Sequence, residues 1–279
     1  MSIQAQPPIF LVGCPRSGTT FLQSAIAAHP TIHSFPETQF FKHLTPHNPL
    51  KAQLGLVARS KIRPKLISFF QEINRPDLIS TIPQIPYKPI YINYFINLLQ
   101  SLTHEQGKDR FLEKTPEHLY YIPEIEPYVP GVKFIHLFRN GTDVVASLYE
   151  VTHRYPQRWW GVWTLDYCID RWLEMVALSQ TYLDQPHHCA VRYETLLQNF
   201  SECLQRICQF LNIEYSEAMI DNYHHSSKFL INTTSRQVEN QIRDISTVSS
   251  KFESLFDESQ REYIIERVSA VDLETIPFL

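Results

Sequence analysis

The stretch Pro8-Ile9-Phe10-Leu11-Val12-Gly13-Cys14-Pro15-Arg16-Ser17-Gly18-Thr19-Thr20 decides the fold. Its first five residues are an apolar run that stops at a glycine, which is typical of a short buried strand. From Thr19 onward, apolar residues recur at helical spacing until the chain reaches His29-Pro30. Residues 13–18 are therefore predicted to be a tight turn between a strand and a helix.

Two further strand–helix units follow along the chain. Residues 132–138 form an apolar run that ends at the turn Arg139-Asn140-Gly141, and a helical pattern starts at Thr142-Asp143. Residues 189–193 form a third apolar run, and a helix with one apolar face covers 201–211. Strands that alternate with helices predict an α/β fold with a central parallel sheet flanked by helices.

No repeat, low-complexity tract or linker divides the sequence, so we expect one domain over residues 1–279. Two stretches interrupt the strand–helix pattern and are interpreted as helical excursions from the sheet. Residues 40–110 carry frequent prolines, and residues 151–185 begin with an aromatic-rich segment, Tyr155 to Trp172. These aromatic side chains either line a pocket or belong to the core, and the sequence leaves both readings open.

Composition excludes several classes of protein. A chain of 279 residues buries enough surface to fold without disulfides, and a net charge of −4 argues against a general nucleic-acid binder. The five cysteines are scattered and contain no C-x-x-C pair, which favours a reducing compartment. The N-terminus has no signal-peptide pattern and the apolar runs are too short to span a membrane. We therefore expect a cytoplasmic protein without membrane or nucleic-acid partners.

The turn at residues 13–18 has the glycine spacing of a phosphate-binding P-loop, G-x-x-x-x-G. Its backbone N–H groups and the start of the next helix can hold an anion. Nucleotide triphosphatases need a lysine after the second glycine, and this chain has Thr19 there. Arg16 lies inside the loop instead, and the strand that ends at Phe138 is followed by Arg139 rather than by an aspartate for magnesium. The sequence thus predicts an anion held by protein cations, with no metal required.

These motifs resemble those of the sulfotransferases that use 3′-phosphoadenosine 5′-phosphosulfate (PAPS). Residues 15–22 are similar to that family's 5′-phosphosulfate loop, and residues 138–141 followed by Ser147 are similar to its 3′-phosphate site. Residues 113–116 (Glu-Lys-Thr-Pro) and 192–197 (Arg-Tyr-Glu-Thr-Leu-Leu) match further motifs in the family's order. The resemblance runs from residue 8 to about 255. It implies a P-loop NTPase-like sulfotransferase fold, PAPS as cofactor and 3′-phosphoadenosine 5′-phosphate (PAP) as product.

The resemblance also implies roles for single residues. Glu37 corresponds to the general base of the tyrosylprotein and carbohydrate sulfotransferases, whose motif pattern is the most similar, and Lys114 corresponds to the lysine at the leaving oxygen. His33 and His43 remain rival bases, whereas His136, in the middle of an apolar strand, fits a core residue. The implied catalytic residues are Glu37, Lys114 and Arg16, and the implied cofactor-binding residues are Arg16, Ser17, Gly18, Thr19, Thr20, Arg139, Ser147, Tyr193 and Arg243.

The implied reaction is in-line transfer of a sulfuryl group from PAPS to a hydroxyl, or an amine, of a small metabolite or peptide. Two alternatives stay open at this point. A P-loop kinase or NTPase lacks support because the lysine and the magnesium aspartate are missing. A non-catalytic PAP-binding protein would have no need of Glu37 and Lys114.

Overall fold

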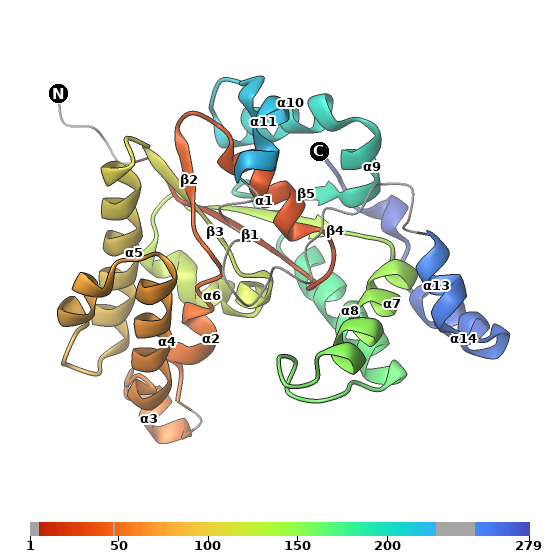
Figure 1. Cartoon of the computed structure of the whole chain (residues 1–279), viewed down its shortest axis with the longest axis horizontal. Coiled ribbons are helices and arrows are strands. Elements are labelled where there is room, and N and C mark those ends of the chain that lie inside the picture. Colours follow the sequence, from red (N-terminus) through yellow and green to blue (C-terminus); the bar gives the residue numbers. More distant parts are fainter. Residues whose placement is uncertain (1–5, 47, 227–248) are drawn as a thin grey trace.

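The computed structural model describes residues 6–46, 48–226 and 249–279, and within them the centre is a five-stranded parallel sheet (Figure 1). Its strands are β1 (Ile9–Gly13), β2 (Ile32–Ser34), β3 (Arg110–Lys114), β4 (Lys133–Phe138) and β5 (His188–Arg192), in the spatial order β2-β3-β1-β4-β5. Every neighbouring pair is parallel, which confirms the predicted α/β class. The carboxyl ends of all strands therefore meet at one edge, with the end of β1 in the middle of that edge.

Helices cover both faces of the sheet because alternate residues of each strand point to opposite sides. Ile9 and Leu11 of β1 pack in one hydrophobic cluster with α1 (Thr19–Ala27), α9 (Tyr193–Gln198), α10 (Phe200–Leu211) and α11 (Ala218–Asp221). Phe10 and Val12 point to the other face and pack in a cluster that includes α2 (Phe40–Leu44), α5 (Lys88–Glu105), α7 (Gly141–Arg154) and α8 (Leu165–Gln180).

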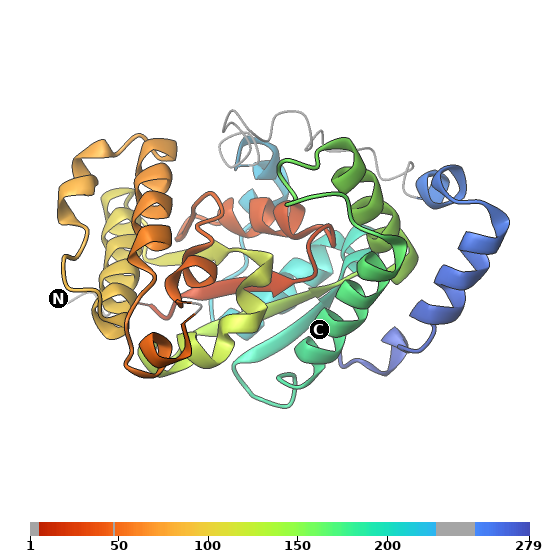
Figure 2. The same cartoon turned by 90° about the horizontal axis from the view of Figure 1, so that it is seen from below.

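The remaining elements lie around this layered centre. Figure 2 shows α4 and α5 at one end of the molecule and α13 and α14 at the other. The further helices are α3 (Pro49–Gln53), α4 (Arg59–Glu72), α6 (Ile122–Ile125), α13 (Ser249–Leu255) and α14 (Glu258–Val268), and the 3-10 turns are η1 (Pro76–Thr81), η2 (Pro116–Tyr121), η3 (Glu126–Tyr128) and η5 (Leu273–Thr275). Among the described residues, no helix is both long and apolar enough to cross a membrane.

Two strands were not predicted from the sequence. β2 has only three residues, too few for a periodic pattern. β3 contains Arg110, Glu113 and Lys114, and its charged side chains are buried together with its apolar ones. A strand of this composition lacks the apolar run by which the other strands were recognised. Charged residues are rarely buried unless they have specific partners, so the sequence offered no reason to expect a buried strand here.

The aromatic segment from Tyr155 to Trp172 divides between the core and the surface. Trp172 is buried, and its indole N–H donates to the backbone oxygen of Arg139 at 3.1 Å. Trp159 and Trp163 pack edge to face, whereas Trp160 is 88% exposed. Some aromatic residues of this segment therefore belong to the core and others lie at the surface.

Candidate active site

The turn between β1 and α1 is confined by its neighbours, which explains both of its glycines. Gly13 has a φ of +144°, and a Cβ there would lie 2.5 Å from the backbone oxygen of Leu137 on β4. Gly18 has a φ of +93°, and a Cβ there would lie 2.3 Å from Cε2 of Tyr193. Arg16 also has a positive φ, +75°, which is uncommon for a residue with a side chain. The backbone is thus held in a conformation that costs free energy, as occurs at functional turns.

The second predicted phosphate-binding element lies directly beside this turn. Arg139 follows β4, and Ser147 lies on α7, whose first turn is capped by the side chain of Asn140. Arg139 Nη1 donates to the backbone oxygen of Arg16 at 3.3 Å, and its guanidinium lies 4.5 Å from the ring centroid of Tyr193. The Nε of Arg16 donates to Ser147 Oγ at 3.1 Å. The structure therefore brings together Arg16, Arg139, Ser147 and Tyr193, which come from three separate motifs.

The turn and the Arg139–Ser147 element each contain a buried polar atom with no hydrogen-bond partner among the described residues. These atoms are the hydroxyl oxygen of Ser17 and the Nε of Arg139. A buried donor without an acceptor costs about 1–3 kcal/mol, so native structures normally satisfy such groups. An anionic ligand with several acceptor oxygens would satisfy both, and α1 directs its positive N-terminal end to the same turn. The residues present thus fit a phosphate-bearing cofactor.

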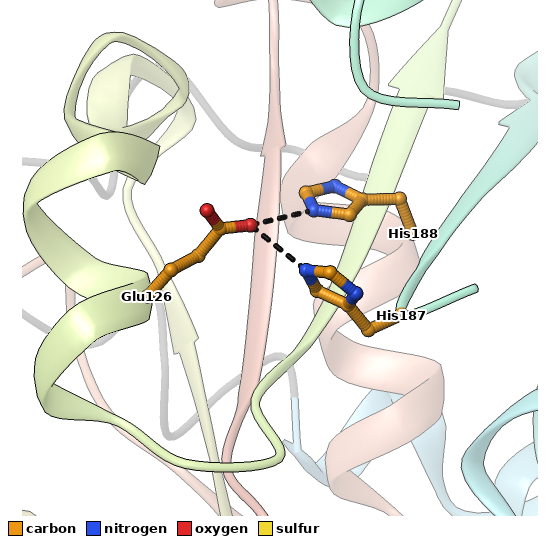
Figure 3. Close-up of side chains that lie close together, drawn as sticks. All are labelled: Glu126, His187 and His188. Atoms are coloured by element: carbon orange, nitrogen blue, oxygen red, sulfur yellow. Dashed lines mark hydrogen bonds and ion pairs between the residues drawn. The ribbon is translucent and has the colours of Figure 1, made fainter. Parts of the chain in front are cut away.

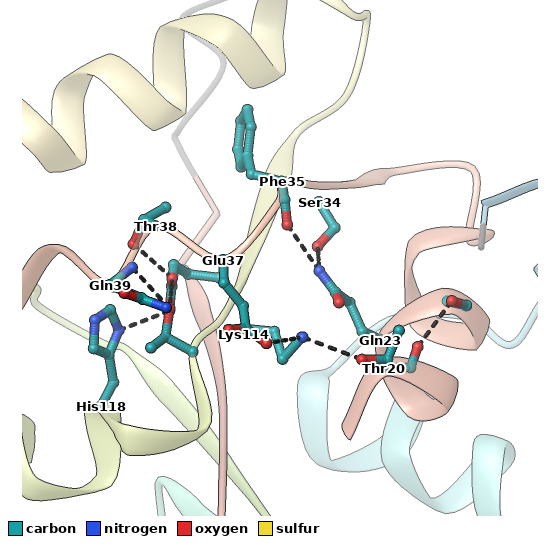
Figure 4. Close-up of polar contacts among 12 residues, drawn as sticks. Thr20, Gln23, Ser34, Phe35, Glu37, Thr38, Gln39, Lys114 and His118 are labelled. Carbon is teal, nitrogen blue, oxygen red and sulfur yellow. Dashed lines mark hydrogen bonds and ion pairs between the residues drawn. The ribbon is translucent and has the colours of Figure 1, made fainter. Parts of the chain in front are cut away.

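A buried lysine and a partly exposed glutamate meet at the end of β3. The Nζ of Lys114 lies 2.6 Å from Oε1 of Glu37 and 3.3 Å from Oγ1 of Thr20, in the first turn of α1 (Figure 4). The lysine side chain is 1% exposed, whereas that of Glu37 is 21% exposed. Because an ammonium group without a counter-charge is costly to bury, the Glu37 carboxylate stabilises Lys114 at this position. Glu37 remains accessible to a second molecule.

A second glutamate, Glu113, was missed as a site residue although it belongs to a quoted motif. Its side chain is 1% exposed. Its carboxylate accepts hydrogen bonds from the hydroxyls of Thr38 and Thr115, both at 2.7 Å, and contacts His118 Nδ1 at 2.8 Å. Burial by itself raises the pKa of Glu113, but His118 and the two hydroxyls together hold it below its ordinary value. The signal in the sequence was a carboxylate directly before the predicted catalytic lysine, in the motif Glu113-Lys114-Thr115-Pro116.

The Glu113 network fixes the loop that carries Glu37. The backbone N–H of Gln39 donates to Thr115 Oγ1 at 3.1 Å, and that of Phe40 donates to Thr38 Oγ1 at 3.3 Å. Gln39 has a φ of +48°, so this loop also holds a left-handed backbone. The two threonine hydroxyls accept from the loop because Glu113 accepts their protons.

The start of the same loop is fixed to α1. The side-chain amide of Gln23 donates to Ser34 Oγ at 2.9 Å and to the backbone oxygen of Phe35 at 2.8 Å (Figure 4). Ser34 Oγ in turn donates to the backbone oxygen of Leu112 on β3 at 2.8 Å. Glu37 is therefore flanked on both sides by residues whose positions are fixed by buried hydrogen bonds.

The remaining residues singled out from the sequence have different positions and environments. Thr19 is buried at the first position of α1, whereas Arg243 lies outside the described residues. Burial raises the pKa of the Cys14 thiol, in keeping with a packing role. The rival base His33 packs its ring edge to face with Phe35, and burial, with a contribution from Lys108, lowers its pKa to about 4.

Known proteins match this chain both in sequence and in structure. A putative protein-tyrosine sulfotransferase of Caenorhabditis briggsae is 25% identical over 221 residues, which are 78% of this chain and 69% of that protein. In five further curated relatives the shared region is 27% to 56% of their length.

Several solved structures share the fold, among them the following two. The sulfotransferase domain from the curacin biosynthetic pathway superposes with a TM-score of 0.63 at 18% identity, over 95% of this chain and 98% of that one. A mouse sulfotransferase solved in complex with PAP gives a TM-score of 0.53 at 16% identity, over 94% and 82% of the two chains.

The match to a family model agrees with these likenesses and decides against a P-loop kinase. Residues 7–217 match the model of the "Sulfotransferase family", and this range contains the turn at 13–18, Glu37, Lys114 and the Arg139–Ser147 element. More than half of the chain is covered. The chain belongs to the sulfotransferase family of enzymes.

Proposed function

We propose that this protein transfers a sulfuryl group from PAPS to a hydroxyl of a small metabolite or peptide, with Glu37 as the general base. The observation that carries the proposal is the contact of Glu37 with Lys114, which in turn contacts Thr20 of the phosphate-binding turn. A carboxylate able to accept a proton and a cation able to stabilise a leaving oxygen thus lie at the same edge of the sheet.

The cofactor assignment is supported by the chemistry of the residues around the turn. Arg139 and Ser147 offer a guanidinium and a hydroxyl to one phosphate, and the turn from Gly13 to Gly18 offers backbone N–H groups to another. The mouse sulfotransferase of similar fold was solved with PAP. When bound, PAPS supplies a sulfuryl group that is activated by its bond to a phosphate.

In the proposed mechanism each residue has a distinct task. The Glu37 carboxylate takes the proton of the acceptor hydroxyl as that oxygen becomes a nucleophile. The Lys114 ammonium, already held in place, stabilises negative charge at the leaving oxygen without reorganisation. Arg16 and Arg139 hold the anionic groups, so that acceptor and donor stay aligned for in-line displacement.

The acceptor class rests on two observations. Glu37 is partly exposed, so an acceptor hydroxyl can reach it from solvent. The similar Caenorhabditis briggsae protein is named as a putative protein-tyrosine sulfotransferase, which makes a peptide with a phenolic hydroxyl a natural member of the acceptor panel. Simple alcohols and amines complete that panel.

Glu37→Gln tests the proposal directly. We expect PAPS-dependent transfer to fall about 10²–10⁴-fold, the usual contribution of a general base, while PAP still binds. Glu124→Gln is the matched control, because this carboxylate pairs with Lys88 outside the site. Unimpaired transfer by Glu37→Gln would show that another group is the base. PAP binding by the wild type without transfer to any acceptor of the panel would contradict the proposed reaction.

A further inference from the structure

Two histidines and a glutamate lie close together (Figure 3). They are at the edge of the sheet opposite to the phosphate-binding turn. His188 is the first residue of β5, and His187 precedes it. Glu126 lies in η3, on the segment that leads to β4. The amino ends of the parallel strands form this edge, so the cluster is separated from Glu37 and Lys114 by the length of the sheet.

The ligand atoms of the cluster already lie close together. Glu126 Oε1 is 2.8 Å from His187 Nε2 and 3.0 Å from His188 Nε2, and the three atoms all lie within 4.8 Å of one another. Ligand atoms of a tetrahedral zinc ion lie about 3.3 Å apart, given Zn–N and Zn–O bonds of about 2.0–2.2 Å. The two distances from Glu126 therefore need to lengthen by only a few tenths of an ångström to suit such an ion, and the two histidine nitrogens already lie within 4.8 Å of each other.

A third histidine, His136, contacts the second ring nitrogen of His188. His136 Nε2 lies 2.8 Å from His188 Nδ1, and both rings stack on Tyr182. The Nδ1 of His136 is buried and has no hydrogen-bond partner among the described residues, so no contact there fixes its tautomer. His136 Nε2 can therefore accept a hydrogen bond from the Nδ1–H of His188, and in that tautomer the Nε2 lone pair of His188 is available to a metal. Metal-bound histidines commonly have such a partner on the second ring nitrogen.

The cluster is open enough to be loaded. The side chains of His187 and Glu126 are 34% and 29% exposed, so an ion can enter and water can complete its coordination. Two imidazoles and one carboxylate suit zinc and similar transition-metal ions, whereas magnesium and calcium prefer oxygen ligands alone. All five cysteines are buried, so in the folded protein they do not compete for the ion.

We propose that Glu126, His187 and His188 form a zinc-binding site that links η3 to the first residue of β5. The ion stabilises this corner of the sheet and takes no part in sulfuryl transfer. This proposal is independent of the proposed function, because none of the three residues lies near the phosphate-binding turn.

The experiment uses the full chain without a histidine tag, after removal of metal by chelation and dialysis. Calorimetric titration with Zn²⁺ is expected to give one equivalent bound. At free zinc about a hundredfold above Kd, we expect Tm to rise by about 5–10 °C. His187→Ala and Glu126→Gln are expected to lose this response. His153→Ala, which removes an exposed imidazole on α7, is expected to keep it, and Mg²⁺ is expected to give none.

Either of two results would overturn the proposal. One is wild-type protein that binds no stoichiometric zinc, and the other is His187→Ala and Glu126→Gln protein that binds zinc as the wild type does. If both variants fail to fold, the visible spectrum of wild-type protein with Co²⁺ decides. Intense tetrahedral bands support the site, and the weak bands of hydrated cobalt contradict it.

Discussion

Replacement of Glu113 by glutamine tests whether the Glu113 network positions the proposed base, Glu37, in addition to stabilising the fold. The substitution keeps the shape of the side chain but removes its charge. In the wild-type protein, the hydroxyls of Thr38 and Thr115 both donate to the same Glu113 oxygen. They also accept from the backbone N–H groups of Phe40 and Gln39, respectively. A glutamine that presents its amide nitrogen to the hydroxyls leaves their protons without an acceptor.

The expected loss of stability follows from the bonds in the network. Three hydrogen bonds to a charged acceptor become bonds to a neutral one, and each such change costs about 1 kcal/mol. A hydroxyl proton left without a partner adds about 1 kcal/mol or more. We therefore expect a loss of about 3–5 kcal/mol in the free energy of unfolding, which corresponds to a fall in Tm of about 6–15 °C. The variant should still fold at 25 °C.

The assay compares Tm, the Kd for PAP and kcat for Glu113→Gln with those for Glu124→Gln. Because the network orders the loop after Glu37, we expect kcat to fall about 10–100-fold, as small misplacements of catalytic groups do. The Kd for PAP should change little, since Arg139 and Ser147 take no part in the network. Glu124→Gln should lose less than about 1 kcal/mol and keep its kcat. A wild-type kcat in Glu113→Gln protein with a lowered Tm would refute the reasoning.

Three other predictions follow from the same site and its surroundings. Arg139→Ala should weaken PAP binding about 30–100-fold but leave the binding of adenosine 5′-phosphosulfate, which lacks the 3′-phosphate, nearly unchanged, and equal losses for both ligands would contradict the assignment. Gly18→Ala should lower the free energy of unfolding by about 2–3 kcal/mol, because its positive φ disfavours a Cβ and that atom would meet Tyr193; a wild-type Tm would count against this. The pKa of His33 is lowered to about 4, so the unfolded chain binds its proton more tightly, and stability falls as pH drops from about 6.5 to 4. We expect His33→Asn to recover about 2 kcal/mol of that loss in denaturation curves across this range, and an unchanged pH profile would exclude His33 as the cause.

The strands with apolar runs were predictable, and the strand with charges was not. β1, β4 and β5 were predicted from the sequence because apolar residues predominate in each, although β4 also contains Lys133 and His136, and β5 passes directly into α9 at Tyr193. β3 buries Glu113 and Lys114 because both have partners: Thr38, Thr115 and His118 for Glu113, and Glu37 for Lys114. Thr38 and Glu37 become neighbours of β3 only through the fold, so the local pattern does not reveal the strand.

The candidate site shows the same division. The motifs predicted which residues gather at the carboxyl edge of the sheet, and the contacts among Arg16, Arg139, Ser147 and Tyr193 agree with that grouping. The contact of Arg16 with Ser147 depends on the left-handed backbone at Arg16, which spacing does not predict. The chemical roles of these residues remain predictions that the variants above test.

The position of β1 at the centre of the sheet has a consequence for folding. Ile9 of β1 pairs with Leu112 of β3 on one side and Lys133 of β4 on the other. The strand β1 therefore has no strand to pair with until more than a hundred later residues have been synthesised. Pairings over such separations are slow to form, because a long loop must close before any contact is gained. An emerging chain therefore exposes the apolar strand and its phosphate-binding turn until β3 and β4 leave the ribosome. The yield of folded protein should therefore depend on whether chaperones keep this strand from aggregating during that interval.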